Sequence, residues 1–128
     1  MPRATVVHGS PEDQQQYDLK TLEGGYVTLR RLTYGEFLQR RQMTTSMRLQ
    51  AGQSDEGFSG EMDLVNYKAV EFEFKHCIID HNLEDEEGKQ LDFKRPGTLD
   101  RLNPKVGEEI GSYIDKMNQY NEAEHQGN

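Results

Sequence analysis

The stretch "LDFKRPGTLDRLNPKVGEEIGSYIDKMNQY", residues 91–120, carries the clearest signals for the fold. A Pro-Gly pair interrupts the chain at 96–97. Asn103 followed by Pro104 is then typical of an N-cap with proline at the first helical position. Behind them, apolar side chains recur at helical spacing and form one face: Val106, Ile110, Tyr113, Ile114 and Met117. The stretch therefore predicts an amphipathic helix that ends near residue 120 and closes a small fold.

Shorter signals precede this helix. Alternating residues on either side of "LEGG" predict a β-hairpin, and Thr33 with Glu36 has the capping-box spacing of a helix start. In chain order we expect strands at 16–21 and 26–31, helices at 33–49 and 61–76, and a second hairpin from 77–80 to 91–93. The predicted fold class is α+β. It is a helix-dominated single domain with an N-terminal hairpin, three helices and a short second hairpin before the C-terminal helix.

Polar and Gly-rich segments set the predicted domain boundaries. Residues 1–15 are expected to be a disordered arm, 16–121 one globular domain with a flexible loop at 51–60, and 122–128 a loose tail. The chain of 128 residues carries a net charge of −8, which argues against nucleic acid as a partner. Without an apolar span or a signal peptide, and with one cysteine, we expect no membrane partner and an intracellular location.

The segment "HCIIDH" holds the only cluster of residues that could suggest chemistry. His76, Cys77, Asp80 and His81 are all possible metal ligands, but zinc patterns need a second ligand pair at a set distance. We therefore expect a structural cysteine, surface histidines and no cofactor. Known nucleophile and phosphate-binding motifs are absent from the sequence, so we expect no enzyme. A metal-dependent enzyme using His76, Cys77 and His81 is kept as a minor hypothesis.

The predicted helix 33–49 carries the candidate partner-binding residues. Methionine side chains are flexible and suit surfaces that accept irregular apolar partners, although filling the core is their commoner role. Arg41 and Arg48, seven residues apart, share a helix face. They could contact the acidic half of this chain, an acidic partner helix or only solvent. The candidate contact residues are Phe37, Leu38, Arg41, Met43, Met47 and Arg48.

Three segments together resemble the tail assembly chaperones of long-tailed, siphovirus-like bacteriophages: "YVTLRRLTYGEFLQRRQM", "VEFEFKHCIIDHNL" and "EEGKQLDFKRPGTLDRLNPKVGEEIGSYIDKMNQYN". The similarity covers roughly residues 17–121. The closing segment is its most specific part, with Leu99, Leu102, Pro104, Gly107, Glu109, Ile110, Ile114 and Asn118.

This resemblance implies a non-enzymatic protein of the host cytoplasm that is absent from the finished particle. Such a protein binds the tape measure protein and keeps it soluble while the tail tube polymerises around it. A longer frameshifted form would recruit the tail tube protein. Because small chaperones with limited cores often associate through the apolar surface that they offer to clients, we also expect a homo-oligomer. The alternative is a structural tail-completion or head–tail joining protein of the virion.

Overall fold

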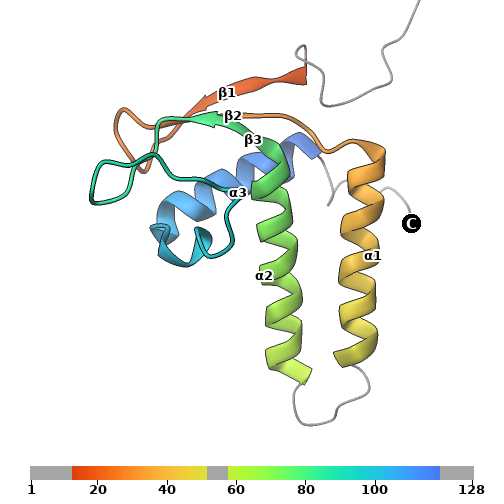
Figure 1. The fold of residues 1–128 in the computed structure, drawn as a ribbon. Coiled ribbons are helices and arrows are strands. Elements are labelled where there is room, and N and C mark those ends of the chain that lie inside the picture. The colour runs from red at the N-terminus through yellow and green to blue at the C-terminus, as the bar shows by residue number, and fades with distance from the viewer. Residues whose placement is uncertain (1–12, 52–57, 119–128) are drawn as a thin grey trace, which may run out of the picture.

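The computed structural model describes residues 13–51 and 58–118 (Figure 1). The greater part of the predicted arm, the middle of the predicted loop and the predicted tail therefore lie outside the described residues. The folded part begins slightly earlier than expected, since Asp13 already binds Arg31 and the first strand begins at Gln15.

The described strands form one antiparallel sheet in the order β1-β2-β3. β1 (Gln15–Asp18) and β2 (Tyr26–Leu29) make the predicted N-terminal hairpin, with Tyr17 opposite Val27. Gly24 lies in the turn with φ +81°, a conformation that a residue with a Cβ rarely adopts. Val27 and Leu29 of β2 are buried in the core, whereas Tyr26 and Thr28, which alternate with them, are half-buried on the other face.

Three α-helices accompany the sheet, as predicted. They are α1 (Tyr34–Ala51), α2 (Phe58–Cys77) and α3 (Pro104–Asn118), and a short 3-10 helix, η2 (Leu99–Arg101), precedes α3. α2 is longer than predicted by three residues at its start, and α1 extends to Ala51, so both ends of the predicted loop 51–60 are helical. α3 begins at the predicted proline because Asn103 caps it: the Asn103 side chain accepts a hydrogen bond from Lys105 N–H at 2.9 Å.

The second predicted hairpin forms only as a turn with a single bridge, between Glu84 and Gln90. The strand that enters it, β3 (Ile78–His81), pairs with β2 rather than with residues 91–93. Pairing with β2 extends a sheet whose inner face is already apolar, so Ile78 is buried beside Leu29. An acidic turn offers no such burial.

The hydrophobic core lies between the sheet, α3 and the C-terminal end of α2. Ile110 and Ile114 of α3 and Phe74 of α2 are almost completely buried there. Figure 1 shows α1 and α2 side by side and antiparallel, extending together away from the sheet and α3. α1 contributes no described side chain to this core. The domain therefore consists of a compact core and a two-helix extension.

Candidate partner-binding site

The start of α1 is set by the capping box that its sequence predicts. The backbone N–H of Glu36 donates to the Thr33 hydroxyl at 3.2 Å, and the N–H of Thr33 donates to the Glu36 carboxylate at 2.9 Å. Each side chain thus satisfies a backbone donor that the first helical turn leaves without a partner.

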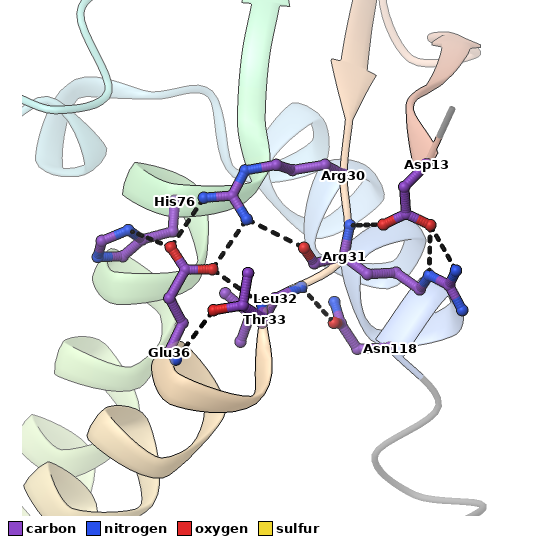
Figure 2. A network of polar contacts seen from close by, with 8 residues as sticks. All are labelled: Asp13, Arg30, Arg31, Leu32, Thr33, Glu36, His76 and Asn118. Atoms are coloured by element: carbon purple, nitrogen blue, oxygen red, sulfur yellow. Dashed lines mark hydrogen bonds and ion pairs between the residues drawn. The ribbon is translucent and has the colours of Figure 1, made fainter. Parts of the chain in front are cut away.

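Glu36 also connects α1 to the end of β2, through Arg30 directly after it, and to α2 (Figure 2). Arg30 donates two hydrogen bonds of 2.8 Å to its two carboxylate oxygens, and His76 Nδ1 lies 3.2 Å from Oε2. The Arg30 hydrogen bonds, against partial burial, lower the pKa of Glu36 to about 2. Burial lowers the pKa of His76, although the Glu36 carboxylate opposes this. The carboxylate is therefore ionised at neutral pH and joins three elements.

Two further contacts hold the segment before α1 (Figure 2). Arg31 Nε donates to Asp13 at 2.7 Å, and the backbone N–H of Leu32 donates to the Asn118 side chain at 2.9 Å. Asn118 is the last residue of α3. Polar contacts therefore attach the N-terminal end of α1 to both ends of the described chain.

The interface between α1 and α2 contains a buried ion pair. Arg40 Nε donates to the Glu73 carboxylate at 2.7 Å, and Glu73 is only 4% exposed. Burial raises the pKa of Glu73, while Arg40 opposes the rise. Thr44 is the one fully buried residue among the described side chains of α1, and Ala69 of α2 is buried too. An arginine of α1 thus pairs with a buried carboxylate of α2.

The five predicted contact residues whose side chains the structure describes do not form one strip. Phe37 is half-buried with the Arg41 guanidinium 4.8 Å from its ring centre, and Leu38 is 39% exposed. The sequence interpretation missed Tyr34 and Leu49, which are 74% and 67% exposed and share a helix face with Leu38. Their i, i+4 and i+15 spacing was the available signal. We call Tyr34, Leu38 and Leu49 the outer face of α1.

Met43 and Met47 lie on the other side of α1, half-buried, against α2. They line a groove of about 450 Å³, which we call the α1–α2 groove, together with residues of α2 and the segment 93–96. Its lining is Met43, Met47, Lys68, Glu71, Phe72, Lys75, Phe93, Lys94, Arg95 and Pro96. The Arg48 side chain lies outside the described part of the structure.

The residues of "HCIIDH" are dispersed. Cys77 is buried in the core, and this burial raises the pKa of its thiol to about 12. His76 contacts Glu36, whereas His81 accepts a 3.0 Å hydrogen bond from Leu83 N–H and packs edge-on against Phe93. The expectation of surface histidines is wrong for His81, which is buried. Within residues 13–51 and 58–118, no three His, Cys, Asp or Glu side chains are grouped so that they could hold a metal ion.

Two other grooves have carboxylates in their walls. One, of about 600 Å³, lies beside the turn at Glu84–Glu86, where Arg101 binds Glu86. The other, of about 650 Å³, lies between α2 and α3 and contains Glu108 and Asp115. The α1–α2 groove differs because four of its lining residues are basic and one is acidic. None of the helices in the described segments is long and apolar enough to cross a membrane.

Comparison of the chain with protein-family models, with characterised proteins and with solved structures finds no match.

Proposed function

We propose that this protein is a non-enzymatic tail assembly chaperone of a long-tailed bacteriophage, which binds the tape measure protein and keeps it soluble while the tail tube polymerises. The proposal starts from the sequence resemblance. The structural observation that supports it is the position of α1, an 18-residue helix that contributes no described side chain to the hydrophobic core. A helix of this length that is not needed in the core is available for a partner.

The apolar side chains of α1 suit a helical client. Leu38 is exposed and Phe37, Met43 and Met47 are half-buried, so binding a client would remove further apolar surface from water. Grooves between two helices accept amphipathic helices through apolar residues spaced by one turn. Methionine adapts its shape to different neighbours, which suits a long client with an irregular sequence. The predicted contact residues Phe37, Leu38, Arg41, Met43 and Met47 are carried into this proposal, with the groove methionines as the main anchors.

The proposal places the protein in the host cytoplasm and outside the mature virion. The tail tube protein would be a second partner, recruited by a longer frameshifted form. Self-association through the outer face of α1 would shield Tyr34 and Leu49 when no client is present.

Co-expression with segments of the tape measure protein from the same phage tests the proposal. The wild-type chain should keep such a segment in the soluble fraction, and Met43→Asp with Met47→Asp should lose this effect. The control is Gln39→Asp with Ser46→Asp, which adds the same charge at exposed positions of α1 outside the groove. A client segment that precipitates to the same extent with the wild-type chain as without it would refute the proposal.

The alternative, a tail-completion or head–tail joining protein, predicts a different location. Mass spectrometry of purified virions should then find this chain in stoichiometric amounts, whereas the chaperone proposal predicts that it is absent.

A further inference from the structure

Both α1 and α2 contribute apolar side chains to the wall of the α1–α2 groove. Met43 and Met47 are one helical turn apart on α1, and Phe72 faces them from α2. Phe72 is held in place by the His76 ring, whose centre is 4.3 Å from its own. Pro96 and the buried Phe93 continue the apolar lining beyond α2. A partner side chain entering here would meet flexible thioethers on one side and a supported aromatic ring on the other.

The polar residues that line this groove are predominantly basic. Lys68 and Lys75 come from α2, and Lys94 and Arg95 come from the segment after the acidic turn. Glu71 is the one acidic residue in the lining, and it lies 3.4 Å from Lys68. Among the described residues, Lys75, Lys94 and Arg95 form no ion pair. The groove thus concentrates positive charge on a chain whose net charge is −8.

The spacing of these cations suits a helix. Lys68 and Lys75 are seven residues apart on α2, which places them on one face and about 10 Å apart along the axis at 1.5 Å per residue. A helix that lies along the groove can present carboxylates at the same seven-residue spacing. Its apolar residues, one turn from each carboxylate, would then face Met43, Met47 and Phe72.

We infer that the α1–α2 groove binds an amphipathic helix whose apolar stripe is flanked by Asp and Glu. This inference rests on the proposed function and specifies the class of client segment that the protein recognises. Opposite charges along the rim set the orientation of the client and speed its association, while the apolar lining supplies affinity.

A polyanion such as nucleic acid fits this groove less well than an acidic helix. Phosphates would take the place of water at the cations but would leave the methionine and phenylalanine surfaces uncovered. The net charge of −8 also repels an extended polyanion at long range. An acidic amphipathic helix can cover the apolar lining of the groove and pair with its basic residues.

Two synthetic helical peptides test the inference on the full chain by fluorescence anisotropy. Both carry the same leucine stripe, flanked by Glu in one and by Lys in the other. The Glu peptide should bind at least about tenfold more tightly at low salt, and the difference should shrink as NaCl rises from about 50 to about 500 mM. Lys75→Glu with Arg95→Glu should abolish or reverse this preference. Lys89→Glu with Lys105→Glu changes the net charge equally at exposed positions outside the groove and should preserve it.

Three results of the peptide experiment would overturn the inference. They are equal binding of the two peptides, a preference that the groove variant leaves unchanged, and displacement of the Glu peptide by duplex DNA at comparable concentration. A dimer that the groove variant dissociates would assign the groove to a second copy of the chain, which also contradicts the inference. The co-expression experiment tests the proposed function separately. If the chain keeps the client soluble but binds both peptides equally, only this inference is refuted. If the chain prefers the Glu peptide but does not keep the client soluble, only the chaperone role is refuted.

Discussion

Glu36 shows how a single residue can connect a helix to the rest of a small fold. Its carboxylate accepts hydrogen bonds from Arg30 and from the backbone of Thr33, and it lies 3.2 Å from His76. Both Glu36 and Arg30 have side chains that are less than one-fifth exposed. The contact is therefore screened less than an ion pair at the surface and is expected to contribute measurably to stability.

The lowered pKa of Glu36 makes stability depend on pH. Its pKa is about 2 in the folded protein and 4.5 ordinarily, so the unfolded chain binds the proton more readily. The contribution is fully present above pH 4.5 and is lost as the pH falls towards 2. By linkage it amounts to at most about 3 kcal/mol.

Glu36→Gln should therefore destabilise the protein most at neutral pH and progressively less towards pH 2. Urea unfolding across this range measures the difference. Glu109 provides a matched variant. Its pKa is also about 2, because hydrogen bonds from Lys20, Thr21 and Tyr113 outweigh the effect of burial. Glu109→Gln leaves the Arg30–Glu36 contact intact. A difference between wild type and Glu36→Gln that stays constant with pH would contradict this account.

Ile110 is the residue on which the closing helix depends. It is fully buried, beside Ile114 and Val106, in the core. Ile110→Ala should lower the free energy of unfolding by about 2–5 kcal/mol, and Ile110→Asp, which buries a charge without a partner, should prevent folding. Thermal melting followed by circular dichroism measures both. Lys105→Asp on the exposed N-terminal turn of α3 is the control, and an unchanged midpoint for Ile110→Asp would show that this face of α3 is not part of the core.

At the scale of elements, a buried ion pair contributes to the contact between α1 and α2. Glu73 is buried, and its charge is compensated by Arg40. Removing Arg40 leaves the Glu73 carboxylate buried without this partner, whereas replacing both residues with apolar ones removes the cost of burying either charge. The attachment of α1 to α2 is thus sensitive to single changes and tolerant of a matched pair.

Arg40→Met should destabilise the protein by about 3–5 kcal/mol at neutral pH. Glu73→Leu in the same chain should restore most of this loss. Because burial raises the pKa of Glu73, the carboxylate takes up a proton as the pH falls, and the defect of the single variant should then diminish. Chemical unfolding of the two variants at two pH values gives the comparison. Equal destabilisation of both variants would mean that Arg40 acts through its packing alone.

An element could be predicted from the sequence when the residues that determine it lie within one short segment. α3 was predicted almost to the residue because the Asn-Pro start and the apolar period agree within one segment. The pairing of β3 with β2 was not predicted, because it joins Ile78 to Leu29 across nearly fifty residues. The strand register and the sheet order are decided by shared burial of Val27, Leu29 and Ile78, which no short window of sequence contains.

The candidate site was predicted in part for the same reason. The sequence identified Phe37, Leu38, Met43 and Met47 as apolar residues of one helix. It did not indicate that only the methionines would face α2 and line the groove, while Leu38 lies on the outer face of α1. The basic rim was also missed, because Lys94 and Arg95 reach the groove only through the folding of the segment after the acidic turn.

At the scale of the whole molecule, the proposed binding surface lies outside the hydrophobic core. The sheet, α3 and the end of α2 share a continuous apolar core, while α1 and the rest of α2 extend from it and are held by polar contacts (Figure 1). Such an extension can change its packing on a client without exposing the core. This division is what the chaperone proposal requires, because the client-binding surface must adapt while the domain stays folded.

The most direct test is amide hydrogen exchange of the full chain with and without a bound segment of the tape measure protein. The account predicts slower exchange on binding in α1 around Met43 and Met47, in α2 around Phe72, and in the segment 93–96. Exchange around Ile110 and Ile114 should be slow in both states. Protection confined to the sheet and α3, with α1 unchanged, would contradict the claim that α1 and its groove exist to hold a client helix.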